Sequence, residues 1–324
     1  MANPPPVDPE LVVENLPKLG EITPEVLKSM RAAMASPADV AGTIDNRPMT
    51  HSEHRIPSSD GSGYEIILSC FHPRTATTTL RPCIYNIHGG AMMWGDRHHT
   101  LSFALDAVVE CDAVCVSVEY RLAPEHAFPT PLEDCYDGLA WVSKHAAELG
   151  IDSTRIMIAG ISAGGTFSAA TALLCRDRKG PKLCAQVLGC PALDDRLVTP
   201  ASYQYVDGVH GVAFSRELML SVWEKYLGGR EHSKKAMTYA APGRTEDLLD
   251  LPPAFIDVGS ADVLRDEAVA YASKLWACGV QAELHVWRGG SHGFELFLPH
   301  AALSKACLDT RMAWVKKELA KKAI

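Results

Sequence analysis

Apolar residues fall into short unbroken runs that alternate with stretches of helical periodicity. The strand-like runs are 83–87, 113–118, 155–159, 186–189, 253–259 and 283–287. A short apolar run bounded by turn residues is typical of a strand that is buried on both faces. Residues 165–174, by contrast, have the pattern of a helix. Strands that alternate with helices predict an α/β fold, with a mostly parallel sheet and helices on both of its faces.

The chain before this region has a different pattern. Thr23 followed by a proline is a helix N-cap signal, and a stripe of apolar residues at helical spacing follows it. The stripe consists of Val26, Leu27, Met30 and Met34. We expect residues 1–45 to be helical and separate from the core. The core should begin near His54 with a hairpin that turns at residues 58–63.

A second segment interrupts the alternation. About 55 residues, from 196 to 250, separate the run at 186–189 from the run at 253–259, far more than a strand-to-helix connection needs. Within it, Ser215 precedes an amphipathic stripe that ends at Gly228, so an N-cap and a C-terminal glycine bracket a helix. A long helical insert between two core strands predicts a cap over a site.

The candidate nucleophile lies between a strand and a helix. Residues 160–164 read Gly-Ile-Ser-Ala-Gly and connect the run at 155–159 to the helix at 165–174. This is the context of a G-x-S-x-G nucleophile elbow, in which tight packing excludes a Cβ on either side of the serine. We expect Ser162 in strained geometry at a helix N-terminus, where the helix dipole favours a developing negative charge.

A glycine turn follows an upstream strand. The run at 83–87 ends in His88-Gly89-Gly90-Ala91. Glycine lets backbone amides approach a ligand oxygen, and such amides form an oxyanion hole together with the amide after the nucleophile. We predict Gly89, Gly90 and Ala163 as the donors. The alternative is an ordinary glycine turn with a buried histidine.

The candidate acid and base follow two later strands. Asp262 comes just after the run at 253–259, and His292 lies in the loop after the run at 283–287. The order Ser, Asp, His is that of α/β-hydrolases and differs from the orders in chymotrypsin and subtilisin. Asp257 and Asp266 are rivals for the acid. Asp257 lies inside a strand and Asp266 a helical turn later, so Asp262 is preferred.

With these residues, the chain resembles the hormone-sensitive-lipase-like group of α/β-hydrolase carboxylesterases. The resemblance runs from about Arg55 to the C-terminus and includes residues 118–126 and 132–135. Three positions depart from the usual pattern of the group. Ala91 replaces a third glycine, Ile161 replaces an aspartate, and Val263 replaces a proline. They concern rate and substrate shape rather than the type of reaction.

The resemblance implies an α/β-hydrolase fold and a cap made of an N-terminal segment and an insert. We therefore expect cap segments at 1–45 and 196–250 and core segments at 46–195 and 251–324. It also implies hydrolysis of short- to medium-chain esters through a Ser162, His292 and Asp262 triad, without a metal or organic cofactor. A lactone or aryl amide is an alternative substrate, and a small-molecule receptor on a hydrolase scaffold is a rival function that the presence of His292 disfavours.

Residues beside these groups are the expected pocket walls. They are Ala91, Met92, Trp94, Ile161 and Phe294. For Met92, Met93 and Trp94, core packing is an equal alternative. For Arg121 and Glu125, which follow a strand end, the alternatives are contact with the site and a buried ion pair that supports the loop, and we expect the ion pair. The adjacent His98 and His99 predict a solvated surface rather than a metal site, because no acidic or cysteine cluster accompanies them in the sequence.

Composition narrows the setting. The 324 residues carry a formal net charge of −8 and have no basic patch, so we expect no nucleic-acid partner. No apolar run approaches the roughly 20 residues of a membrane span, and no signal peptide is evident. The ten cysteines lack close pairs and predict reduced thiols in a cytoplasmic protein. The resemblance implies that its partner is a small-molecule ester. The sequence does not determine the oligomeric state, and a homodimer is one option.

Overall fold

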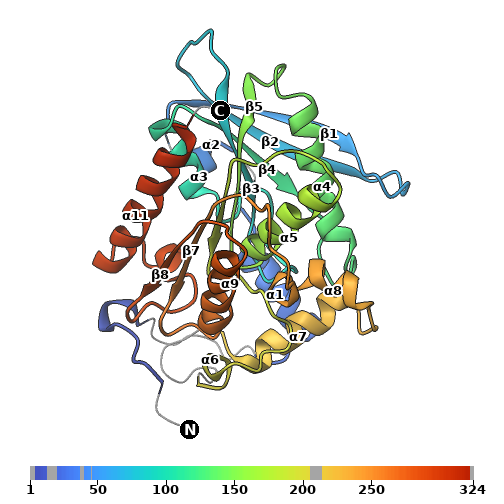
Figure 1. Ribbon diagram of the computed structural model, residues 1–324, viewed down its shortest axis with the longest axis vertical. Coiled ribbons are helices and arrows are strands. Elements are labelled where there is room, and N and C mark those ends of the chain that lie inside the picture. The colour runs from blue at the N-terminus through green and yellow to red at the C-terminus, as the bar shows by residue number, and fades with distance from the viewer. Residues whose placement is uncertain (1–3, 13–19, 37–39, 45, 205–213, 322–324) are drawn as a thin grey trace.

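An eight-stranded sheet runs through the molecule in the order β1-β2-β4-β3-β5-β6-β7-β8 (Figure 1). The computed structural model describes residues 4–12, 20–36, 40–44, 46–204 and 214–321. The strands are β1 Met49–Pro57, β2 Glu65–Pro73, β3 Arg81–Ile87, β4 Val114–Glu119, β5 Ile151–Ile161, β6 Ala185–Gly189, β7 Ala254–Gly259 and β8 Ala282–Trp287. β1 pairs antiparallel with β2 and β2 with β4, whereas all later pairs are parallel. The predicted α/β fold and the hairpin are confirmed.

Helices cover both faces of this sheet. α3 (Ser102–Glu110) and α11 (Ala302–Leu319) lie on one face, and α4 (Thr130–Lys144), α5 (Ala163–Asp177) and α9 (Arg265–Ala277) lie on the other (Figure 1). Successive side chains of a strand point to opposite faces. Accordingly, Ile84 packs in the cluster that contains α3 and α11, whereas Tyr85 packs in the cluster that contains α4 and α5. This two-sided burial explains why the central strands are continuous apolar runs.

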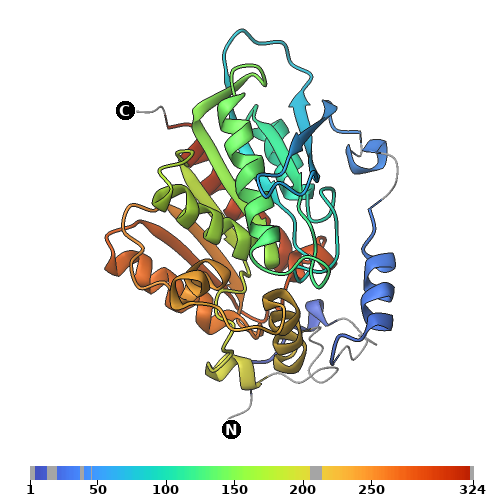
Figure 2. The ribbon, with the colours of Figure 1, turned by 90° about the vertical axis from the view of Figure 1, so that its right-hand side faces the viewer.

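The two segments outside the alternating core lie near one another. α1 (Pro24–Ala33) begins after Thr23, whose hydroxyl accepts a hydrogen bond from the Val26 amide. In the insert, α7 (Arg216–Leu227) begins after Ser215 and ends at Gly228 in the left-handed conformation, as the sequence predicts. α6 (Pro200–Gln204) precedes it and α8 (Lys234–Ala240) follows it. Figures 1 and 2 show α1 and α7 at the same end of the sheet.

The remaining helices are short. They are α2 (Val40–Ile44), α10 (Phe294–Phe297) and the 3-10 turns Pro9–Leu11 and Pro242–Arg244. Parts of the expected cap segments, residues 1–3, 13–19, 37–39, 45 and 205–213, lie outside the described residues. All ten cysteines are free thiols. Among the described helices, none combines the length and the apolar character that crossing a bilayer requires.

Candidate active site

Ser162 lies at a strained turn between β5 and α5. Its backbone has φ 58° and ψ −121°, a conformation that side-chain-bearing residues rarely adopt. The flanking glycines are sterically required, because a Cβ on Gly160 would lie 2.3 Å from the Gly164 carbonyl oxygen and a Cβ on Gly164 would lie 2.0 Å from the Ile87 carbonyl oxygen. The expected nucleophile-elbow geometry is therefore present, and it places the Ser162 hydroxyl at the N-terminus of α5.

A hydrogen-bonded chain connects Ser162, His292 and Asp262. His292 Nε2 lies 2.9 Å from Ser162 Oγ, and His292 Nδ1 lies 2.8 Å from Asp262 Oδ2. Asp262 Oδ1 also accepts a hydrogen bond from the Leu264 amide, at 2.9 Å. The rival acids lie elsewhere: Asp266 pairs with Arg265 and accepts from the Ala201 amide, and Asp257 pairs with Arg311. Asp262 is thus the carboxylate that contacts the imidazole.

Burial and charge act on His292 in opposite directions. Burial disfavours the imidazolium and is the largest single influence, but the charge and hydrogen bond of Asp262 and the contact with Cys190 together raise the pKa of His292 well above its usual range. Cys190 lies on the other side of the ring, with its Sγ 4.0 Å from Nε2. Burial raises the pKa of the Cys190 thiol, so this group is protonated at neutral pH.

The turn after β3 presents free backbone amides. Gly90, Ala91 and Met92 have φ values of 116°, 50° and 63°, so three successive residues adopt left-handed conformations. A Cβ on Gly90 would lie 2.0 Å from the Trp94 carbonyl oxygen, which excludes any other residue without backbone movement. The Gly90 and Ala91 amides donate to no acceptor within the described part of the chain. These two amides, with that of Ala163, are free to donate hydrogen bonds to a bound oxygen atom.

Gly89 differs from the expectation. Its amide donates to Thr100 Oγ1 at 3.0 Å and is therefore occupied. His88 is a buried histidine, stacked on Tyr120 with ring centroids 4.1 Å apart. Burial lowers the pKa of His88 to about 3, and its Nδ1 lies 2.7 Å from the Gly89 carbonyl oxygen. The turn therefore contains the buried histidine of the alternative interpretation, and His88 holds it in shape.

A cavity of about 450 Å³ opens at Ser162 and His292. Its lining residues come from the core and from both segments outside it: Met30, Ala33, Met34, Gly89, Gly90, Ala91, Trp94, His99, Thr100, Ile161, Ser162, Phe214, His292, Gly293, Leu296 and Phe297. The Phe214 ring lies against His292, with centroids 4.3 Å apart. The walls are apolar except near the reactive groups and at His99 and Thr100. Such an enclosure excludes water and orients an apolar ligand.

Known proteins share this sequence and architecture. A family model for the α/β-hydrolase fold matches residues 84–296. Carboxylesterase NlhH of Mycobacterium tuberculosis is 37% identical over 262 residues, which are 79% of this chain and 80% of that protein. An arylesterase of Saccharolobus solfataricus is 33% identical over 71% of this chain and 73% of its own. The chain belongs to the α/β-hydrolase family.

Solved structures agree with this assignment. A bacterial heroin esterase superposes on this hydrolase with a TM-score of 0.87 and 32% identity, over 97% of this chain and 98% of that one. Esterase LipW of Mycobacterium marinum superposes with a TM-score of 0.84 and 26% identity, over 98% and 99% of the two chains. Together with the sequence relatives, these neighbours make the protein a carboxylic ester hydrolase of the hormone-sensitive-lipase-like group.

Two of the five expected pocket residues of the hydrolase lie elsewhere. Ala91, Trp94 and Ile161 line the cavity, but Met92 is 1% exposed and packs in the core. Phe294 packs against Leu11 and Cys307, away from the cavity. The sequence places all five beside reactive groups but does not show which way each side chain points. Met30 and Met34 line the cavity as well, and the apolar stripe at helical spacing to which they belong is the sequence signal that could have identified them.

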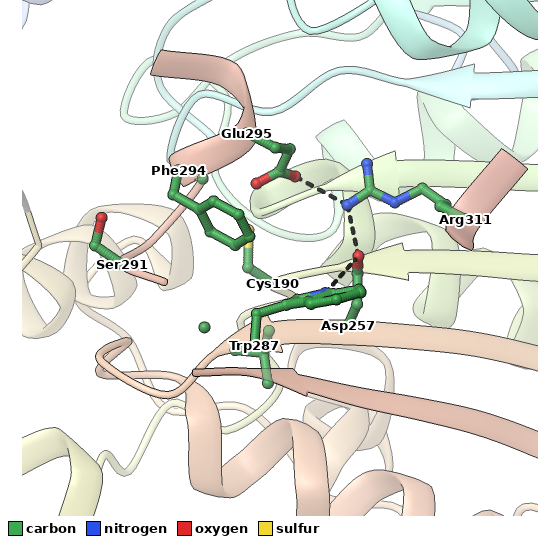
Figure 3. Close-up of a pocket in the computed structure, with 10 residues that line it drawn as sticks. Cys190, Asp257, Trp287, Ser291, Phe294, Glu295 and Arg311 are labelled. Atoms are coloured by element: carbon green, nitrogen blue, oxygen red, sulfur yellow. Dashed lines mark hydrogen bonds and ion pairs between the residues drawn. The ribbon is translucent and has the colours of Figure 1, made fainter. Parts of the chain in front are cut away.

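A buried ion cluster lies behind the His292 loop. Arg311 on α11 is 1% exposed and lies 2.8 Å from Asp257 Oδ2 and 2.9 Å from Glu295 Oε1 (Figure 3). Asp257 belongs to β7, which leads toward Asp262, and Glu295 follows His292 by three residues. Arg311 thus links the elements that carry the acid and the base. No sequence pattern identifies this role, because arginine is rarely buried and its usual place on a helix is the solvated face.

The expected pair of Arg121 and Glu125 is wrong. Arg121 is buried with Asp134, at 2.7 Å, and also contacts Asp60. Glu125 is half-exposed and pairs instead with Arg31 on α1, at 2.7 Å. Arg31 also donates to the carbonyls of Met93 and Ala123. This arginine therefore fastens α1 to the loops beside the oxyanion turn.

Proposed function

We propose that this ester hydrolase cleaves short- to medium-chain acyl esters through an acyl-enzyme on Ser162. The observation that carries the proposal is the continuous Asp262–His292–Ser162 hydrogen-bonded chain at the base of an apolar cavity. A base within hydrogen-bond reach activates a serine hydroxyl, and a third group orients the base.

The proposed reaction uses the hydrogen-bonded chain and the free amides in four steps. Ser162 Oγ attacks the ester carbonyl carbon while His292 Nε2 takes its proton, and the carbonyl electron pair moves to the oxygen. The Gly90, Ala91 and Ala163 amides stabilise this oxyanion. When the carbonyl re-forms, the C–O bond to the alcohol breaks and His292 returns the proton to the alcohol. Water then attacks the acyl-enzyme by the same steps, which releases the carboxylic acid. No step uses a metal ligand.

The cavity supports the preference for shorter acyl chains. Its walls include Met34, Trp94 and Phe297, which bound the space around Ser162. Ala91 adds a methyl group at the oxyanion turn where the related group usually has glycine. We expect long chains to exceed this space and to lose turnover.

The proposal includes a cap formed by the N-terminal segment and the insert. Three contacts support it: Met30 and Met34 line the cavity from the first segment, Phe214 contacts His292 from the second, and the Ile22 amide donates to Ser221 Oγ between them, at 3.1 Å. These contacts support a cap in which the two segments meet over Ser162.

The decisive experiment measures hydrolysis of p-nitrophenyl esters of graded acyl length. Wild type should be most active on short chains, Ser162→Ala should lose nearly all turnover, and EDTA should change nothing. The matched control is Ser168→Ala, on the same helix and fully buried, which should retain activity. Full activity in Ser162→Ala would overturn the mechanism. A maximum on long-chain emulsions would overturn the chain-length preference alone.

A further inference from the structure

A polar cluster joins the β1–β2 hairpin to the loop after the oxyanion turn. His51 and Glu53 lie on one face of β1, opposite Phe71 and Ser69 of β2. His98 folds onto the same face, and its ring centroid lies 6.0 Å from that of His51. Ligand atoms of His51, Glu53 and His98 all lie within 4.8 Å of one another. The expectation of a solvated surface at His98 is wrong, because both it and His51 are half-buried.

Each of the three side chains retains an atom that can donate an electron pair to a metal ion. His51 Nε2 is buried and has no hydrogen-bond partner among the described residues. Ser69 Oγ lies 3.2 Å from His98 Nε2, and this contact orients the His98 ring. The other ring nitrogen of His98 remains available to a ligand. Arg97 pairs with Glu53 through Oε1 and orients the carboxylate. A buried ring nitrogen without a partner is costly, so it requires a ligand or an explanation.

The charges around the cluster favour a cation. Glu53 and Glu119 both pair with Arg97, and Asp96 accepts from the His98 amide at 2.8 Å. Two carboxylates thus pair with one guanidinium, and a third carboxylate lies beside His98.

We infer that His51, His98 and Glu53 form a binding site for a divalent transition-metal cation such as Zn²⁺. Two imidazoles and a carboxylate are an established donor set for this ion, with water in the remaining position. Zinc–ligand bonds of about 2.0–2.2 Å place the ligand atoms roughly 3.3 Å from one another. The side chains of His51, Glu53 and His98 must therefore change rotamer to bring their ligand atoms closer together. The site is separate from the triad and adds no step to ester hydrolysis.

One short segment connects the proposed metal site to the active site, so metal binding would affect the active site through it. The loop from Asp96 to Thr100 carries His98, and the Thr100 hydroxyl in this loop accepts a hydrogen bond from the Gly89 amide. His99 of the same loop lines the cavity. A cation that ties His98 to β1 would therefore stabilise the loop that supports the oxyanion turn. We expect added Zn²⁺ to raise the unfolding temperature by mass action.

The test is calorimetric titration of ZnCl₂ into full-length protein that has been treated with EDTA and dialysed. Wild type should bind one equivalent more than the double variant His51→Ala/His98→Ala. Glu53→Gln, which keeps the side-chain shape, should weaken that site more than tenfold. The matched control is His54→Ala: this residue lies on the opposite face of β1, against Trp141, and should bind like wild type.

Two results would overturn the inference. One is wild-type stoichiometry equal to that of the double variant. The other is an equal loss of binding in His54→Ala, which would place the ion elsewhere. Circular dichroism of each variant establishes that it is folded, and Glu53→Gln decides the outcome if either histidine variant fails to fold. Ester hydrolysis by the metal-free variants should remain at the wild-type rate.

Discussion

Replacing Arg311 by leucine should destabilise the protein strongly and in a pH-dependent way. The guanidinium is 1% exposed and is the cation that contacts the buried carboxylates of Asp257 and Glu295. Removing one partner of a buried ion pair costs about 3–5 kcal/mol, because the remaining charge has neither water nor a counterion. Total stabilities are roughly 5–15 kcal/mol, so a loss of this size is readily measured.

The pH dependence identifies the cause. In Arg311→Leu, the two uncompensated carboxylates should hold a proton that the unfolded chain releases at neutral pH. Where the folded state binds one more proton, the free energy of unfolding falls by about 1.4 kcal/mol per unit rise in pH. The variant should therefore recover stability relative to wild type between pH 8 and pH 6. Adding Asp257→Asn and Glu295→Gln should remove the charge and restore most of the loss.

Urea unfolding followed by circular dichroism at pH 6, 7 and 8 measures these differences. The control is Arg196→Leu, whose side chain is 52% exposed and pairs with Asp194. An exposed pair contributes about 0–1 kcal/mol, so this variant should change little at any pH. A loss below 1 kcal/mol in Arg311→Leu, or one that does not vary with pH, would refute the interpretation of the cluster as ionised. Because Glu295 follows His292 closely, kcat should also fall in the folded variant.

Three further predictions concern the reaction itself. Asp262→Asn should reduce kcat about 10⁴-fold by favouring the wrong imidazole tautomer, whereas Asp266→Asn should retain turnover; the reverse result would reassign the acid. The rate should rise with pH as His292 loses its proton, with a midpoint above its ordinary value of about 6.5, since Asp262 raises its pKa. In Asp262→Asn that midpoint should move to lower pH, and an unchanged pH–rate profile would contradict this cause. Gly90→Ala should abolish activity, because its Cβ would collide with the Trp94 carbonyl oxygen at 2.0 Å, whereas Gly63→Ala, with open space around it, should remain active.

The sequence by itself determined the buried strands, the turn at Ser162 and the strand ends that carry Asp262 and His292, because each depends on residues that are neighbours in the chain. Apolar runs identified the buried strands because a strand covered on both faces excludes polar side chains. The glycines around Ser162 identified the elbow, since only glycine fits where backbones approach to 2.0–2.3 Å of a Cβ position. The positions of Asp262 and His292 after strand ends were sufficient to place both at one edge of a parallel sheet.

The tertiary structure alone decided which distant residues meet. Met92 and Phe294 turn into the core, Gly89 donates to Thr100, and Arg311 enters a buried cluster through partners 54 and 16 residues away. His98 acquires His51 and Glu53 from a strand more than 40 residues earlier. Neither periodicity nor a short motif encodes these contacts, because the direction of a side chain and the partner of a charge depend on how separate elements pack. The sequence by itself therefore specified the scaffold and its reactive groups, whereas packing specified the cavity walls, the ion cluster and the cation site.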